Sequence, residues 1–390
     1  MVVGIIDGQT VQGVAIAKNL REARIKTILF CSERLSYGYN SKYSHKSILS
    51  PSSKNIEKFH NFFIDYLSRQ SLDFIIACND DSAIYIAQKK HILEKLVRIL
   101  SPTIESFNKG FNKNLLMNLC KKNGIPHPKT IDLNHIKMKK ELIDIDYPAI
   151  LKPNALSGAR GFLEVKNKEE LLNGLELISK QKNGYHIQEL LPASGRQLKV
   201  QILRINKKII AKSVIEKIRF YPRKGGSSCF NRTSNGFNES IDNCTRVLEI
   251  LDWEGFADFD LIEDIRNGEF KIIEINPRFP ACIKSVFLSG IDYPLLIIEK
   301  LFNQRLKAGT KIKKIVYLRF ITLDLLWLLN KKTTLKDLIC FFKSFTYKNH
   351  FYQDLDFNDF KSFFYGTLGN LKQLINGKKQ KKIKIENTNI

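Results

Sequence analysis

Two segments decide the fold: Gly255-Phe256-Ala257-Asp258-Phe259-Asp260-Leu261 and, after a short polar turn, Phe270-Lys271-Ile272-Ile273-Glu274-Ile275-Asn276-Pro277-Arg278. Polar and apolar residues alternate along both, and a period of two predicts strands that each have one polar face. The turn between them contains Gly268. The sequence therefore predicts an antiparallel hairpin with its acidic residues on one side.

The carboxylates of Asp260 and Glu274 are expected to converge near the ends of this hairpin, with Asn276 on the same face as Glu274. Converging carboxylates repel each other unless a cation lies between them. Ligands that are all oxygen select a hard cation, and Mg²⁺ usually completes its octahedron with substrate phosphates. Arg278 could reach the same phosphates as a charge-assisted donor. The alternative interpretation is an amphipathic hairpin whose acidic face is simply solvated.

A second candidate segment handles phosphate. Lys152 lies at the end of the apolar strand expected over residues 148–153, and a charged side chain there needs an anionic partner. The loop Ala155-Leu156-Ser157-Gly158-Ala159-Arg160-Gly161 follows, and small residues let backbone N–H groups approach phosphate oxygens closely. The alternative is an exposed turn next to a lysine that extends its charged end to solvent.

A third segment is basic and glycine-rich: Arg219-Phe220-Tyr221-Pro222-Arg223-Lys224-Gly225-Gly226. Arginines beside glycines suit a bound carboxylate or γ-phosphate, because a guanidinium pairs with such groups through two parallel hydrogen bonds. We expect Arg223 to act on the substrate, with a plain surface turn as the alternative.

The chain divides into regions of different pattern. Strand and helix signals alternate over roughly the first hundred residues, which predicts a parallel sheet. The pattern becomes aromatic and basic after residue 308, where we expect a small helical region and a basic tail. The expected domains are 1–105, 106–192, 193–307 and 308–390.

Composition sets outer limits on function. The 390 residues are 43% apolar and 26% charged, as in globular proteins. No apolar run reaches the roughly 18–20 residues of a membrane span, and the start lacks the basic region of a signal peptide. The seven cysteines form no C-x-x-C pair, so we expect a reducing cytoplasm. The net charge of +24 favours polyanionic partners, or it reflects an excess of lysine throughout the chain.

These residues resemble the ATP-grasp superfamily, particularly its carboxylate–amine ligases and carbamoyl-phosphate-synthetase-like proteins. The resemblance covers about residues 1–303, and Glu274-Ile275-Asn276-Pro277-Arg278 is its most specific match. It implies an α/β fold: an ATP-grasp fold of two α+β lobes, preceded by a Rossmann-like pre-ATP-grasp domain and followed by the helical region.

The resemblance also implies site residues for ATP with Mg²⁺, or Mn²⁺ in its place. Relatives often carry an acidic residue after the equivalent of Gly195, where this chain has Arg196-Gln197, so the ribose contact is not assigned. The implied metal ligands are Asp260, Glu274 and Asn276, the nucleotide-binding residues are Lys113, Lys152, Ser157, Gly158, Gly161, Glu189 and Leu191, and the catalytic residues are Arg278 and Arg223.

The implied reaction phosphorylates a small carboxylate with ATP, and an amine then displaces the phosphate to form an amide. Other ATP-grasp chemistry stays open, either a carbamate-type ligase or a small-molecule kinase, as does a nucleotide-binding module without turnover. No RRM, KH or helix-turn-helix signature indicates specific nucleic-acid binding. Oligomerisation and contact of the C-terminal region with an anionic membrane also stay open.

Overall fold

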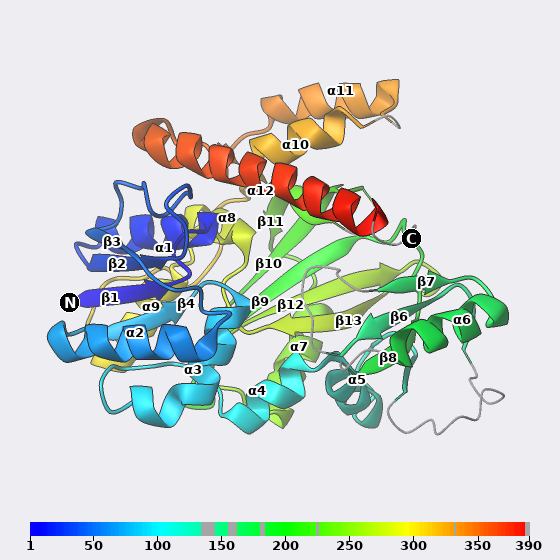
Figure 1. Cartoon of the computed structure of the whole chain (residues 1–390), viewed down its shortest axis with the longest axis horizontal. Coiled ribbons are helices and arrows are strands. Elements are labelled where there is room, and N and C mark those ends of the chain that lie inside the picture. Colours follow the sequence, from blue (N-terminus) through cyan, green and yellow to red (C-terminus); the bar gives the residue numbers. More distant parts are fainter. Residues whose placement is uncertain (134–144, 155–161, 180–183, 224–225, 331–332, 387–390) are drawn as a thin grey trace.

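The computed structural model describes residues 1–133, 145–154, 162–179, 184–223, 226–330 and 333–386, without the side chains of residues 179, 374 and 376–386. Ser157, Gly158 and Gly161 of the predicted phosphate loop lie outside the described residues. Figure 1 shows helices on the outside and strands of a large sheet through the middle of the molecule.

The N-terminal part contains a four-stranded sheet in the order β3-β2-β1-β4, and every pair in it is parallel. The alternation of strands and helices predicted this pairing, because a parallel crossover needs a connecting element. The strands are β1 (Val2–Ile6), β2 (Lys26–Cys31), β3 (Lys46–Leu49) and β4 (Phe74–Ala77), and the helices that follow them are α1 (Val11–Glu22), α2 (Ile56–Arg69), α3 (Asp80–Leu93) and α4 (Ile104–Phe111).

A second, smaller sheet has the order β5-β8-β6-β7. Its apolar side packs on helix α6, where Leu171 and Ile178 contact a cluster that includes Leu151 and Ile187. Helix α5 ends before Gly124, whose positive φ of 61° suits the residue just past a helix. The elements are α5 (Lys113–Lys122), β5 (Thr130–Asp132), β6 (Ala149–Pro153), β7 (Leu163–Val165), α6 (Lys168–Ser179) and β8 (Tyr185–Glu189).

The largest sheet has seven strands in the order β13-β12-β9-β10-β11-β14-β15. Its apolar face packs on α5 and α7, because Leu198, Val200 and Ile202 alternate with polar residues along β9. The turn at Asn206-Lys207 joins β9 to β10, and both residues have positive φ, as a type I′ hairpin turn requires. The elements are β9 (Gln197–Ile205), β10 (Lys208–Tyr221), β11 (Ser227–Ser234), α7 (Asn238–Ile250), β12 (Gly255–Asp264), β13 (Glu269–Asn276), α8 (Lys284–Ser289) and α9 (Tyr293–Phe302).

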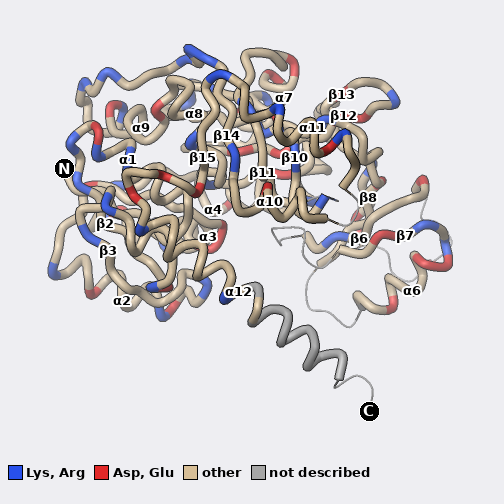
Figure 2. The backbone as a smooth tube through the Cα atoms, turned by 90° about the horizontal axis from the view of Figure 1, so that it is seen from above, with Lys and Arg blue, Asp and Glu red and all other residues tan. Residues whose placement is uncertain are grey.

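The C-terminal region is helical, as predicted, but it also adds two short strands to the large sheet. Strand β14 (Tyr317–Arg319) pairs with β11, and β15 (His350–Tyr352) pairs with β14. The helices are α10 (Ile321–Leu328), α11 (Leu335–Lys343) and α12 (Phe360–Glu386). Among the described residues, no helix is both long and apolar enough to cross a membrane. Figure 2 shows lysine and arginine in every part of the chain and not in one stripe.

A buried ion-pair cluster attaches α10 to the sheet. Asp324 is fully buried and accepts hydrogen bonds from Arg219 Nε at 2.8 Å and Nη2 at 2.6 Å. Arg319 Nη1 lies 3.1 Å from the same carboxylate. One anion therefore balances two buried guanidinium groups, which also stack on Phe230 and Phe341.

We expect Asp324→Ala to lower the free energy of unfolding by about 3–5 kcal/mol, because it leaves two buried cations without a counter-charge. Chemical denaturation measures the change. Asp65→Ala is the matched control, since Asp65 forms an exposed pair with Arg69 and its loss should cost at most about 0.5 kcal/mol. Equal, small losses in the two variants would show that the cluster does not hold the C-terminal region in place.

Candidate functional site

The predicted hairpin is present, and it places polar side chains on one face of the large sheet. Strands β12 and β13 pair antiparallel, with Asp260 opposite Glu274 and Asp258 opposite Asn276. The amide nitrogen of Asn276 donates to Asp260 Oδ2 at 3.1 Å. Two carboxylates and an amide therefore meet at the end of the hairpin, as the alternating pattern predicted.

Lysines from the neighbouring strands supply the counter-charge. Lys199 on β9 lies opposite Asp260, and its Nζ donates to Asp258 at 2.7 Å and to Asp260 at 2.9 Å. Lys217 on β10 donates to the other oxygen of Asp260 at 2.5 Å. Burial opposes charge on Lys199, but the two carboxylates outweigh it and raise its pKa. Burial likewise acts against Asp260, yet the lysines lower the pKa of that carboxyl group well below its ordinary value.

Arg278 connects the hairpin to the N-terminal part. Its Nε donates to Asp80 at 3.0 Å, at the start of α3, and its Nη2 donates to Asn276 Oδ1 at 3.1 Å. Its Nη1 lies 3.9 Å from Asp258. Burial disfavours the charge, but Asp80 and Asp258 raise the pKa of Arg278. The guanidinium is thus charged and fixed in orientation beside the carboxylates.

Two lysines approach from the smaller sheet. Lys113 is the first residue of α5, and its Nζ lies 3.0 Å from Glu274 Oε2. Lys152 on β6 donates to the neutral amide of Gln188 at 2.8 Å. Burial lowers the pKa of Lys152 to about 8, with attraction from Glu274 and repulsion from Lys113 as smaller effects. A buried ammonium group beside a neutral amide gains most from an anionic ligand.

We use the term charged face for these nine side chains, which comprise five cations and four carboxylates. Burial raises the pKa of Asp258, against the attraction of Lys199. Cations outnumber carboxylates by one in this set. Such a surface suits a ligand that is itself a net anion. The members are Lys113, Lys152, Lys199, Lys217, Arg278, Asp80, Asp258, Asp260 and Glu274.

The oxygen ligands at the end of the hairpin suit a hard cation. Asp260, Glu274 and Asn276 offer only oxygen ligands on the pairing positions of one hairpin, and Mg²⁺ prefers oxygen and takes the rest of its ligands from water and phosphates. Within the described residues, no group of three histidine, cysteine, aspartate or glutamate side chains is arranged to hold a metal by itself. Cation binding would also have to displace lysine from Asp260.

The remaining predicted residues lie in other surroundings. Glu189, at the end of β8, is buried, and its carboxylate accepts hydrogen bonds from Lys271 at 2.8 Å and from Arg266 at 2.7 Å. Its contact with adenine stays a prediction. Leu191 is buried two residues after the end of β8, a strand of the sheet that also carries Lys152. Its backbone contact with adenine also stays a prediction.

Arg223 is not brought to the charged face. Its guanidinium donates to Asp337 at 3.0 Å and to Thr333 at 2.9 Å, and it stacks on Trp327 with its central carbon 4.2 Å from the ring centroid. These partners belong to the C-terminal region, so Arg223 fixes α10 and α11 in this structure. The action of Arg223 on a substrate anion stays a prediction.

The sequence argument missed Lys199 and Lys217. Both are charged residues with apolar neighbours in a strand, Leu198-Lys199-Val200 and Ile215-Glu216-Lys217-Ile218. The same reasoning that singled out Lys152 applies to them, because a lysine in a buried strand needs an anionic partner. Their order in the sheet, which places β9 between β12 and β10, was needed to identify that partner.

Comparison with known proteins identifies a domain family and several relatives. Residues 111–282 match the ATP-grasp domain family. D-aspartate ligase of Enterococcus faecium is 23% identical over 263 residues, which are 61% of this chain and 61% of that protein. Tetrahydromethanopterin:alpha-L-glutamate ligase of Methanocaldococcus jannaschii is 23% identical over 222 residues, 54% of this chain and 72% of that protein. The match to the first relative thus spans less than two thirds of its length.

Among solved structures, the biotin carboxylase–βγ-ATP complex of Campylobacter jejuni superposes with a TM-score of 0.65. It is 17% identical, and the match covers 81% of this chain and 74% of that one. This likeness concerns the fold. The range that matches the ATP-grasp domain family contains the small sheet, the β12–β13 hairpin and Arg278.

We expect Lys152→Met to stabilise the free protein and to abolish its stabilisation by Mg-ATP. With a folded pKa of about 8 and an ordinary value near 10.5, the lysine's contribution to stability is present above pH 10.5 and lost as pH falls through about 8. Removing the buried charge should therefore raise the free energy of unfolding at pH 7 by about 1–3 kcal/mol. Thermal denaturation with and without Mg-ATP measures both effects.

The control is Lys208→Met, which removes an exposed lysine from β10 and should change neither quantity. Full stabilisation of Lys152→Met by Mg-ATP would contradict a role for this lysine in nucleotide binding.

Proposed function

We propose that the chain is an ATP-dependent ligase that activates a carboxylate as an acyl phosphate and joins it to an amine. The observation that carries the proposal is the charged face, on which Asp260, Glu274 and Asn276 lie beside Lys113 and a fixed Arg278. The two relatives described above are named as ligases, which supports formation of a bond between an acid and an amine.

The proposed reaction has two steps. A carboxylate oxygen attacks the γ-phosphorus of ATP, the bond from that phosphorus to the β,γ-bridging oxygen breaks, and ADP leaves. A neutral amine then attacks the acyl carbon, the carbon–oxygen bond to phosphate breaks, and the nitrogen loses one proton as the amide forms. The first step spreads negative charge over the transferring group, so the protein contributes mainly position and positive charge.

The residues of the charged face have separate roles in this proposal. Lys152 binds the phosphate chain, since its hydrogen-bond partner Gln188 is neutral and a phosphate would supply an anionic partner. Arg278 stabilises charge at the γ-phosphoryl group, and Asp80 keeps it oriented. Mg²⁺ or Mn²⁺ held by Asp260, Glu274 and Asn276 would neutralise charge on the phosphate oxygens.

We expect Glu274→Gln to reduce Mg-dependent ADP release by about a hundredfold or more, because it removes an anionic ligand but keeps the shape of the side chain. Its free energy of unfolding should change little, since Glu274 is partly exposed. Glu269→Gln is the control, as this exposed residue begins the same strand. Equal turnover in the two variants would refute the metal assignment.

The reaction type is tested by product analysis over amino acids and other small carboxylates. With the correct acid, we expect ADP and phosphate, and added hydroxylamine should trap the acyl phosphate as a hydroxamate. AMP and pyrophosphate as products would contradict the proposal. ADP with a stable phosphorylated alcohol and no hydroxamate would indicate a kinase, and nucleotide binding without turnover of any acid would indicate a binding module.

A further inference from the structure

The C-terminal helices expose an unusual amount of apolar surface. Figure 1 shows α10, α11 and α12 together on one side of the molecule, opposite α2 and α4. Large apolar side chains on α11 are strongly exposed, with Leu335 at 73% and Phe342 at 62%. Monomeric proteins rarely leave such side chains clustered in water unless the surface binds something.

On α12, the apolar stripe lies on the side away from the protein. Gly366 and Gly369 form the inner side, because a Cβ at either position would lie within 2.3 Å of Tyr37 or Leu35. The outer side carries exposed apolar residues at steps of four, four, three and four, which is the spacing of one helical face. These residues are Phe360, Phe364, Leu368, Leu371 and Ile375.

Helix α11 has the same arrangement. Phe341 is buried beside the ion-pair cluster of Arg219 and Arg319. Leu335, Leu338, Ile339 and Phe342 of the same helix are exposed. We call these four residues and the five of α12 the outer face.

Charge is sorted across the same helices. Every exposed charged side chain that the structure describes between residues 333 and 375 is a lysine, namely Lys336, Lys343, Lys348, Lys361 and Lys372. The aspartates of this segment turn inward. In the sequence, lysines 378, 379, 381, 382 and 384 follow, with Glu386 as the one acidic residue after Lys372.

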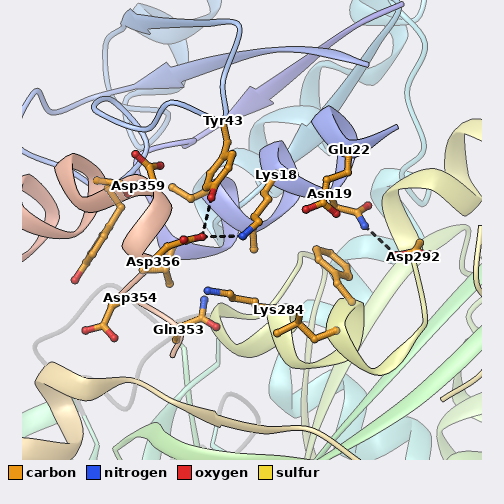
Figure 3. A pocket seen from close by; sticks show the side chains of 17 residues that line it. Lys18, Asn19, Glu22, Tyr43, Lys284, Asp292, Gln353, Asp354, Asp356 and Asp359 are labelled. Atoms are coloured by element: carbon orange, nitrogen blue, oxygen red, sulfur yellow. Dashed lines mark hydrogen bonds and ion pairs between the residues drawn. The ribbon is translucent and has the colours of Figure 1, made fainter. Parts of the chain in front are cut away.

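The inward aspartates attach the C-terminal segment to the N-terminal part, beside a cavity of about 120 Å³. Asp356 bonds Lys18 at 2.8 Å and the Tyr43 hydroxyl at 2.9 Å, and Figure 3 shows both contacts. Asp359 accepts from Ser41 at 2.5 Å. These aspartates are bonded to residues inside the protein. The exposed charged side chains of the segment are therefore the lysines, and its outer surface is positive.

We propose that the outer face is a docking surface for a membrane that contains anionic lipids. Apolar side chains flanked by lysines match the interface of such a membrane, where acyl chains lie beneath negative headgroups. A second copy of the chain is a poorer occupant, because pairing two outer faces would bring like charges together. This inference goes beyond the proposed ligase activity and does not depend on it.

The test is co-sedimentation of the full chain with two kinds of vesicle, phosphatidylcholine alone and phosphatidylcholine with roughly one third phosphatidylglycerol. We expect binding to the anionic vesicles that weakens with salt, and little binding to the neutral ones. The double variants Phe360→Asp/Phe364→Asp and Lys361→Glu/Lys372→Glu should each lower the partition coefficient by about tenfold or more.

Matched controls change equally exposed residues elsewhere. Leu96→Asp/Leu177→Asp replaces side chains that are 50% and 60% exposed, and Lys54→Glu/Lys208→Glu changes exposed lysines outside the outer face. Both controls should bind like the unchanged chain, and circular dichroism should show all variants folded. Absence of binding to anionic vesicles, or equal losses in test and control variants, would overturn the proposal. So would a dimer that the Phe360→Asp/Phe364→Asp variant dissociates, in a chain that does not bind vesicles.

Discussion

The charged face depends on one electrostatic constraint: a buried carboxylate is stable only when cations or other hydrogen-bond donors lie within hydrogen-bond distance. Asp258 and Asp260 meet this requirement because they pair with Lys199 on β9 and Lys217 on β10, the two strands that follow β12 in the sheet. The opposite face of the same strands is apolar and packs on α5 and α7. Each of these strands therefore has one apolar face, which packs on helices, and one face that carries the charged side chains.

The same constraint connects parts of the chain that are distant in sequence. Lys113 reaches Glu274 from the start of α5, and Arg278 reaches Asp80 at the start of α3. The charged face thus joins the small sheet, the large sheet and the N-terminal parallel sheet. A nucleotide bound there would contact groups from several of these parts, so its binding is expected to affect their relative positions.

Local patterns predicted the β12–β13 hairpin and the pairing of Asp260 with Glu274, because an alternating pattern specifies both the strand and the side of each residue. They also predicted the parallel N-terminal sheet. The partners of Arg223 were not predictable in this way, since Asp337 and Trp327 lie more than a hundred residues later. Nor were β14 and β15, whose three residues each are too short to show a period.

The central claim is that the charged face binds Mg-ATP, and calorimetric titration with a non-hydrolysable ATP analogue tests it most directly. The account predicts one site per chain, with an affinity that rises when Mg²⁺ is added and falls as pH rises through about 8, where Lys152 loses its proton. Absence of saturable binding, or an affinity independent of both Mg²⁺ and pH, would contradict it.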